Sequence, residues 1–435
     1  MDQHQTSCTV LENGLTVLIR EMHHAPVATF WIYYRVGSRN EASGITGISH
    51  WTEHMMFKGT PTFPSGELDR ALARLGGQWN AYTSFDFTAY YQTMSASDIG
   101  LSLVIEADRM QNSLFDPAEV EAERTVIISE RQGLENHPTF LLSEEVRAAA
   151  FRVHPYHHTV IGNMADLETI TREDLYRHYR SYYCPGNAVV VVAGDLNGER
   201  MLAQVEERFG RLERGPTIRP VNSHEPEQRG ERRVNVEGDG DTAYLLMSYR
   251  APNVSDPDYF PLVVLGSALL GDSDGVAGGS TTNKSSRLYK ALVETELAAG
   301  VDGGLSPSID PALYSISATV RAPERGRNRS PIERLDLVES AIDAEIARLL
   351  ESHPVTETEL ACAIKRAKAS FAFGSDSVTD QGSWLGLSQV VAGSHTWFGG
   401  YLDNLQGVTL DDVARVAARY LDRRRRTVGR YIPGR

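Results

Sequence analysis

Residues 47–59 read Gly-Ile-Ser-His-Trp-Thr-Glu-His-Met-Met-Phe-Lys-Gly. If this stretch is helical, His50 and His54 lie four residues apart, so both imidazoles project from one face and can share a metal ion. Glu53 lies beside that face, where its carboxylate can reach a water molecule on the metal. The order H-x-x-E-H is the inverse of the H-E-x-x-H motif of zinc peptidases. The stretch therefore predicts a metal-binding helix that carries its own proton acceptor, against the alternative of a surface helix with two unrelated histidines.

A second predicted helix offers candidates for a third metal ligand. Hydrolytic zinc sites keep three protein ligands and leave a fourth position for water, so two histidines need one more donor. Asp116 and Pro117 are typical of the start of a helix, which we expect to run to about residue 135. Glu123 and Glu130 are seven residues apart on it and share one face. Spacing alone leaves open which of the two binds the metal and which holds a ligand in place.

Length and composition describe an ordinary globular protein. A chain of 435 residues is long for one hydrophobic core, and two domains of about 200 residues are expected. The formal net charge of −14 argues against a nucleic-acid-binding protein, which would usually carry a basic stripe. Three cysteines, Cys8, Cys184 and Cys362, form no C-x-x-C pair, so neither a disulfide framework nor a thiolate zinc site is expected.

The expected compartment follows from two missing patterns. No run of 18 apolar residues is present, so we expect no membrane-spanning helix. The N-terminal residues are polar and lack an apolar signal core. A cytoplasmic protein is the expectation, or a periplasmic one if a signal peptide has been removed.

The apolar periodicity predicts alternating strands and helices in the first half. The expected strands cover 15–20, 27–34, a single strand that opens at 80–84 and continues to 93, and 188–193, whose unbroken apolar run is typical of full burial. The expected helices cover about 68–75, 97–111, 116–135 and 140–152, followed by one that Thr171 caps and that runs to Tyr182.

The second half repeats the end of the first. Thr409 and Tyr420 each follow Thr171 and Tyr182 by 238 residues, within similar helix-then-strand patterns. Residues 214–233 are rich in proline, glycine and charge without periodicity, which is typical of a linker. We therefore predict a zinc-binding domain at 1–213, a linker at 214–233 and a second, homologous domain at 234–435. No counterpart of the histidine pair follows the strand predicted at 243–249, so the second domain is expected to lack metal ligands.

Three blocks of the sequence, 47–59, 77–84 and 123–130, resemble the signature blocks of the pitrilysin/insulinase metallopeptidases. The chain is most similar to the half-length branch of that family, which includes the mitochondrial processing peptidase and its bacterial relatives. The resemblance covers essentially the whole chain, including the linker and a block at 285–289. It implies an α+β fold of two similar domains, each a mainly antiparallel sheet with helices packed on one face.

The resemblance also implies roles for individual residues. The third zinc ligand of the family corresponds to Glu130, which lies 76 residues after His54, and Glu123 corresponds to the supporting acid. One Zn²⁺ per chain is therefore expected, bound by His50, His54 and Glu130, with Glu53 and Glu123 as catalytic residues. Peptide substrates are expected to add a strand to the sheet edge at Asn80, Ala81, Tyr82 and Thr83.

One departure from the family pattern bears on partners. Members that complete the site from their second half carry an Arg and a Tyr seven residues apart, but residues 292–301 contain neither. In the family this pair holds substrate and stabilises the oxyanion. We therefore expect a homologous partner subunit that supplies the pair in a heterodimer, with a homodimer as the second choice.

The sequence thus predicts a zinc endopeptidase subunit that hydrolyses short or unfolded peptides in a chamber formed with its partner. The alternative is a non-catalytic scaffold or binding subunit of a larger complex. The complete set of His50, Glu53, His54 and Glu130 argues against that alternative, because a scaffold has no use for the proton acceptor.

Overall fold

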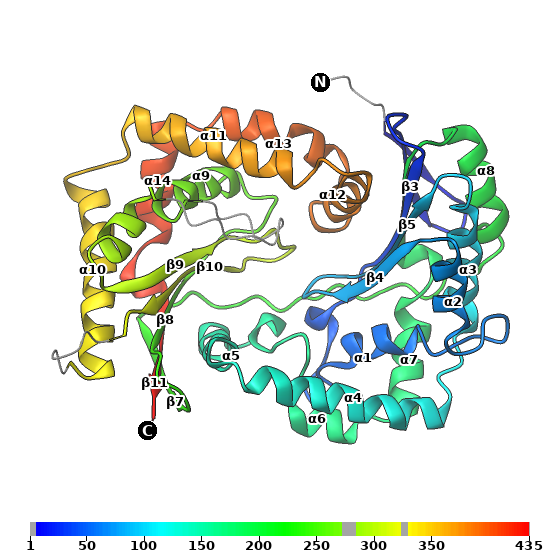
Figure 1. Ribbon diagram of the computed structural model, residues 1–435, viewed down its shortest axis with the longest axis horizontal. Coiled ribbons are helices and arrows are strands. Elements are labelled where there is room, and N and C mark those ends of the chain that lie inside the picture. Colours follow the sequence, from blue (N-terminus) through cyan, green and yellow to red (C-terminus); the bar gives the residue numbers. More distant parts are fainter. Residues whose placement is uncertain (1–5, 272–283, 323–328, 435) are drawn as a thin grey trace. The chain divides into compact units, whose positions relative to one another are not determined.

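The computed structural model describes residues 6–271, 284–322 and 329–434. They fall into two compact units (Figure 1). Among the described residues, the first unit comprises 6–132, His158–Ser223 and Ser375–Phe398, and the second comprises Gly133–His157, 224–271, 284–322, 329–374 and 399–434. Each unit is built around one sheet.

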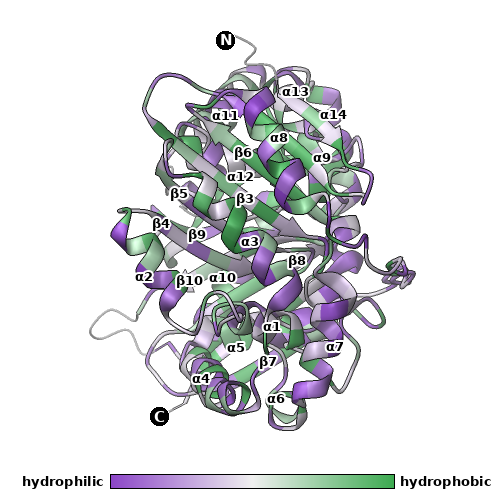
Figure 2. Ribbon diagram, turned by 90° about the vertical axis from the view of Figure 1, so that its right-hand side faces the viewer, coloured by the Kyte–Doolittle hydropathy of each residue, from purple (hydrophilic) through white to green (hydrophobic). Residues whose placement is uncertain are grey.

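The sheet of the first unit has six strands in the order β1-β2-β6-β3-β5-β4. The strands β2 and β6 run parallel, and the other neighbours run antiparallel. All seven residues of β6 are buried, as their apolar run predicts, and Figure 2 shows the hydrophobic colour along β3 and β6. The strands are β1 (Ser7–Val10), β2 (Thr16–Glu21), β3 (Val27–Tyr34), β4 (Gln78–Thr83), β5 (Thr88–Ser95) and β6 (Ala188–Gly194).

Helices surround this sheet. Successive strand residues point to opposite faces, so Phe30 of β3 meets Phe209 of α8 on one face. The adjacent Trp31 and Tyr33 lie on the other face, against α12. The helices of this unit are α1 (Ile48–Met55), α2 (Glu67–Arg74), α3 (Gly100–Asn112), α4 (Pro117–Glu135), α6 (Met164–Thr169), α7 (Arg172–Tyr182), α8 (Gly198–Phe209) and α12 (Val378–Val391).

The region 80–93, expected as a single strand, is a hairpin of β4 and β5. Thr83 pairs with Thr88, and a turn separates the two strands. The Ser84 hydroxyl closes that turn, because it accepts from the N–H groups of Asp86 and Phe87 and donates to the Phe87 carbonyl. The prediction of a single strand was wrong because the Ser84 side chain stabilises the turn. The turn contains no glycine or proline, which are the usual sequence signals of a turn. Within the described residues, β4 lies at the edge of the sheet and pairs with β5 alone.

The sheet of the second unit has the order β7-β11-β8-β10-β9, with β7 and β11 parallel. Its strands are β7 (Arg232–Gly238), β8 (Tyr244–Arg250), β9 (Ala298–Gly304), β10 (Leu313–Val320) and β11 (Arg426–Pro433). Its helices are α5 (Pro138–Ala150), α9 (Tyr259–Leu269), α10 (Pro331–Glu351), α11 (Glu357–Phe373), α13 (Thr396–Gln406) and α14 (Leu410–Tyr420).

The strand order confirms the predicted duplication, since β2-β6-β3-β5-β4 and β7-β11-β8-β10-β9 follow the same plan. Thr171 and Thr409 also begin equivalent helices, α7 and α14, each with a reciprocal capping box. The predicted α+β class is therefore confirmed. None of the described helices has the length and apolar character needed to cross a membrane.

Each unit takes one helix from the opposite half of the sequence. The helix α12, from the second half, packs on β3 and β6, while α5, from the first half, packs on β7, β8 and β11. Both contacts depend on glycine: a Cβ atom at Gly386 of α12 would lie 2.1 Å from Cε2 of Tyr33, and one at Gly429 of β11 would lie 2.1 Å from Cγ2 of Val146. The Tyr33 hydroxyl also donates to the Ser383 carbonyl at 3.0 Å. These helices add a covering on the sheet face opposite the other helices.

We predict that Gly386→Ala lowers the free energy of unfolding by about 1–3 kcal/mol, the usual range for overpacking a core. The added methyl group meets the buried ring of Tyr33, which cannot swing away without breaking its hydrogen bond to Ser383. Gly399→Ala is the matched control, because it also lies within a helix but has open space around its Cβ position. Thermal unfolding of the two variants and the wild type measures the effect. A Gly386→Ala protein as stable as Gly399→Ala would contradict this account of the contact.

Candidate metal centre

The helix α1 places His50 and His54 on one face, as the sequence predicts. It begins after Gly47, whose φ of +89° is a left-handed conformation that favours glycine. Ile48, Trp51 and Met55 are buried beneath the helix, and the two imidazole centroids are 4.6 Å apart. The helix is therefore held by its apolar side while both rings remain partly accessible.

Glu130, on α4, completes a group of three possible metal ligands. Its Oε2 atom lies 3.8 Å from Nε2 of His50 and 3.8 Å from Nε2 of His54, and the three donor atoms all lie within 4.8 Å of one another. Donors around a tetrahedral zinc ion with bonds of about 2.0–2.1 Å are separated by roughly 3.3 Å. The Glu130 side chain is 43% exposed, so it is free to make the small adjustment. The donor set fits zinc and leaves a fourth position open.

Glu123 is not one of the three grouped donors, but it contacts one of them, His54. Its Oε1 atom is 2.8 Å from Nδ1 of His54, and its Oε2 atom is 2.5 Å from Nζ of Lys58. Burial raises the pKa of Glu123, but the hydrogen bonds from His54 and Lys58 outweigh it and the pKa is lowered. An ionised Glu123 accepts the Nδ1 proton of His54, which leaves the Nε2 lone pair available for a metal. The sequence spacing did not distinguish the role of Glu123 from that of Glu130. The contact with His54 indicates that Glu123 supports a candidate ligand, whereas Glu130 is the candidate third ligand.

Lys58 was not predicted as part of the site. It lies four residues after His54, just beyond the end of α1, and its ammonium group offsets the charge of the buried Glu123 carboxylate. The spacing from His54 is the signal that could have identified it.

We predict that Glu123→Gln weakens zinc binding by about 10–100-fold, the usual cost of losing a partner behind a metal ligand. The amide oxygen can still accept from His54, but the charge that makes the imidazole a better ligand is lost. Competition with a metal chelator measures the affinity. Glu121→Gln is the control, because Glu121 lies on the same helix and, among the described residues, its recorded partner is Arg124 on the surface. Equal affinity of both variants would exclude the supporting role of Glu123.

The two histidines differ in their electrostatic surroundings. Burial and the neighbouring His54 lower the pKa of His50 to about 3, so it is neutral at physiological pH, as a metal ligand must be. Burial lowers the pKa of His54 too, but the hydrogen bond that His54 donates to Glu123 and the nearby carboxylates raise its pKa overall. Within the described residues, Nδ1 of His50 is buried without a hydrogen-bond partner.

Glu53 is buried at 7% exposure beside this group. The Thr83 hydroxyl donates to its Oε2 atom at 2.6 Å. Burial raises the pKa of Glu53, and the Thr83 hydrogen bond opposes that effect without cancelling it. A carboxyl group with a raised pKa accepts a proton more readily than an ordinary glutamate. Because Thr83 ends β4, the same bond ties the candidate proton acceptor to the sheet edge.

The predicted substrate-binding residues lie on β4, along that edge. Asn80 and Tyr82 are exposed, whereas Ala81 and Thr83 are half-buried on the other side of the strand. In the described part of the chain β4 pairs with β5 alone, so its second row of backbone groups faces away from the sheet. An extended peptide could pair with that row.

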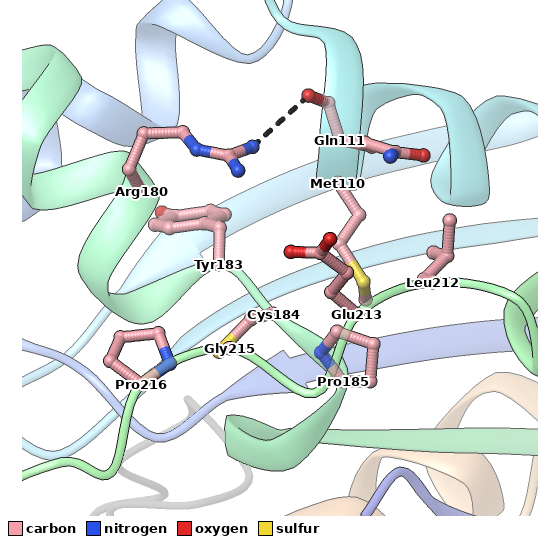
Figure 3. A pocket seen from close by; sticks show the side chains of 10 residues that line it. All are labelled: Met110, Gln111, Arg180, Tyr183, Cys184, Pro185, Leu212, Glu213, Gly215 and Pro216. Carbon is pink, nitrogen blue, oxygen red and sulfur yellow. Dashed lines mark hydrogen bonds between the residues drawn. The ribbon is translucent and has the colours of Figure 1, made fainter. Parts of the chain in front are cut away.

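A separate cavity of about 290 Å³ in the first unit contains none of these residues (Figure 3). Arg180 spans one side of it and donates to the Gln111 carbonyl at 3.3 Å. Burial raises the pKa of the Cys184 thiol, so it stays protonated and unsuited to nucleophilic attack. The lining consists of Met110, Gln111, Arg180, Tyr183, Cys184, Pro185, Leu212, Glu213, Gly215 and Pro216.

Two family models match the chain. The model described as insulinase (peptidase family M16) matches residues 16–163, and the model described as peptidase M16 inactive domain matches residues 169–367. The chain belongs to peptidase family M16. This confirms the resemblance to the pitrilysin/insulinase metallopeptidases. The first model spans α1 and α4, and with them all the candidate metal ligands.

Relatives of this M16 protein include peptidases of several organisms. A probable mitochondrial-processing peptidase subunit beta of Arabidopsis thaliana is 27% identical over 419 residues, which cover 96% of this chain and 76% of the relative. An uncharacterized zinc protease of Mycobacterium tuberculosis is 29% identical over 425 residues, which cover 96% of this chain and 91% of the relative. The crystal structure of a protease from Helicobacter pylori superposes with a TM-score of 0.89 at 27% identity and covers 99% of both chains. The family and these names support a metallopeptidase that uses zinc.

Proposed function

We propose that the chain is the zinc-bearing subunit of an endopeptidase that cleaves short or unfolded peptides. The observation that carries the proposal is the convergence of His50, His54 and Glu130 on one point, with Glu53 buried beside them. These three side chains would hold Zn²⁺, one ion per chain. When bound, zinc would lower the pKa of a water molecule and polarise the carbonyl of the scissile peptide bond.

The chain's own residues perform the proton transfers. Glu53 accepts the proton of the attacking water and returns it to the leaving amine. Thr83 holds one carboxylate oxygen of Glu53, which leaves the other to face the reacting groups. His54 is kept in the required tautomer by Glu123, whose charge is in turn neutralised by Lys58.

The substrate is an extended peptide that pairs with the free edge of β4. Backbone pairing gives affinity without a sequence requirement, and it demands a segment that is not already folded. Because Thr83 belongs to β4 and contacts Glu53, pairing at this edge would bring a peptide carbonyl close to the proton acceptor. Asn80, Ala81, Tyr82 and Thr83 would supply the contacts.

A homologous partner subunit would complete the site. Residues 292–301, in the segment that leads into β9, lack the Arg and Tyr expected there in members that stabilise the oxyanion themselves. The name of the Arabidopsis relative describes it as one subunit of a peptidase. We propose a heterodimer whose second chain supplies both residues and encloses the substrate in a chamber.

Hydrolysis of an unstructured quenched-fluorescence peptide tests this proposal. The zinc-loaded chain is assayed alone and after mixing with a homologous chain from the same organism that carries the Arg and Tyr. We expect slow cleavage by the chain alone and a large increase on mixing. Equal turnover in both samples would exclude the obligatory partner, and no cleavage in either sample would exclude the endopeptidase.

A further inference from the structure

The start of α1 is capped from outside the helix. The first N–H groups of a helix have no partner within it, and a side chain at the N-cap usually accepts from them. The N-cap here is Gly47, which has no side chain, and a Cβ atom there would lie 2.4 Å from the Ile161 carbonyl oxygen. Close packing thus excludes a capping serine or asparagine at this position.

Glu41 takes over the capping role from six residues upstream. Its Oε2 atom accepts from the Gly47 N–H and its Oε1 atom from the Ser49 N–H, both at 2.8 Å. The two bonds hold two points of the first turn to one rigid carboxylate. A negative charge at this end also offsets the partial positive charge that the helix dipole places there.

A buried histidine holds Glu41 in turn. Nε2 of His158 lies 3.0 Å from Oε2 of Glu41, and the two side chains are only 3% and 0% exposed. A carboxylate at this depth requires hydrogen bonds to remain stable. Glu41 therefore has three partners, and two of them are backbone groups of the turn that leads into His50.

We propose that Glu41, held by His158, is a positioning residue that sets the rotation of α1 and thereby the alignment of His50 with His54 and Glu130. His50 directly follows Ser49, so any rotation of the first turn redirects its imidazole. Metal binding requires ligands held to within a fraction of an ångström. This inference rests on the proposed zinc site. Among the described residues, Glu41 bonds to Gly47, Ser49 and His158 and to none of the three candidate ligands.

The test uses the full chain and two metal probes, Zn²⁺ and Co²⁺. Zinc affinity is measured by chelator competition, and the absorption spectrum of the Co²⁺-loaded protein reports the geometry of the ligands. In Glu41→Gln one acceptor oxygen is replaced by a donor that must face an N–H group or His158. We expect zinc affinity to fall by about 10–100-fold and the Co²⁺ spectrum to change.

Glu339→Gln is the matched control. Glu339 is also a buried glutamate paired with cations, Arg233 and Arg430, but it belongs to the second unit. We expect this variant to lose stability while its zinc affinity and Co²⁺ spectrum remain those of the wild type. Such a result separates a general loss of stability from a change in ligand alignment.

A pair of substitutions at His158 tests the same inference if Glu41→Gln does not fold. His158→Ala removes the donor to Glu41, whereas His158→Gln supplies an amide donor. We expect the alanine variant to weaken zinc binding and the glutamine variant to restore it. Wild-type affinity and an unchanged Co²⁺ spectrum in Glu41→Gln, or equal affinities of the two His158 variants, would overturn the inference. A wild-type chain that binds no zinc would instead overturn the proposed function.

Discussion

Replacing Glu53 by glutamine is expected to reduce peptide hydrolysis by about 10²–10⁴-fold, the range for loss of a general base. Glutamine has nearly the same shape, and its amide oxygen can still accept from the Thr83 hydroxyl, but it cannot take up a proton. Because burial raises the pKa of Glu53, exchanging the carboxylate for a neutral amide removes a desolvated charge. The variant should therefore fold at least as well as the wild type and bind zinc with similar affinity, because Glu53 is not among the grouped donors.

Initial rates on the quenched-fluorescence peptide, at equal zinc content, measure this effect. Zinc titration of both proteins is the accompanying control, since it separates lost chemistry from lost metal. A Glu53→Gln protein as active as the wild type would overturn the assignment of an enzyme and favour a scaffold.

Glu130→Gln is expected to weaken zinc binding by more than the roughly 100-fold that loss of a supporting residue can cause. The substitution replaces a carboxylate by a neutral amide at the point where Oε2 faces both imidazole Nε2 atoms. Two histidines alone do not form a stable hydrolytic zinc site. Glu130 is also the most exposed of the three candidate ligands, so little folding stability should be lost.

Glu123→Gln is the matched comparison for this experiment, because it makes the same change on the same helix. Chelator competition on the two variants ranks the two carboxylates. A larger loss of affinity in Glu123→Gln than in Glu130→Gln would reverse the roles that their contacts indicate.

Helices and strands that are marked by a short sequence pattern were predicted to within a few residues of their observed bounds. The helix expected from Asp116 and Pro117 to about residue 135 is α4, Pro117–Glu135, and the helix expected after Thr171 begins and ends as predicted. Both are marked by capping residues whose effect acts within one turn. The strand predicted at 27–34 is also β3, because it is rich in β-branched and aromatic residues.

The exchange of α5 and α12 between the two units was not predicted. The sequence of α12, residues 378–391, does not indicate which sheet this helix covers. The contacts that determine its position are with Trp31 and Tyr33, which are far away in the sequence. Gly382 and Gly386, four residues apart on one helix face, were the available sign of a close approach. Their partner could be identified only in three dimensions.

The candidate site was likewise predictable only where its residues are close together in the sequence. The spacing of His50 and His54 predicted a shared face, and α1 confirms that they lie together. The choice between Glu123 and Glu130 depends on how α4 lies against α1, which periodicity does not describe. The roles suggested for Thr83 and Glu41 likewise depend on contacts between separate elements.

X-ray diffraction at the zinc absorption edge, on crystals grown with Zn²⁺, shows directly whether this group of side chains binds the metal. We expect one strong anomalous peak per chain, at about 2.0–2.1 Å from Nε2 of His50, Nε2 of His54 and a carboxylate oxygen of Glu130. Glu123 should remain bonded to Nδ1 of His54. No peak at this position, or a zinc ion bound by a different set of side chains, would contradict the proposed zinc site.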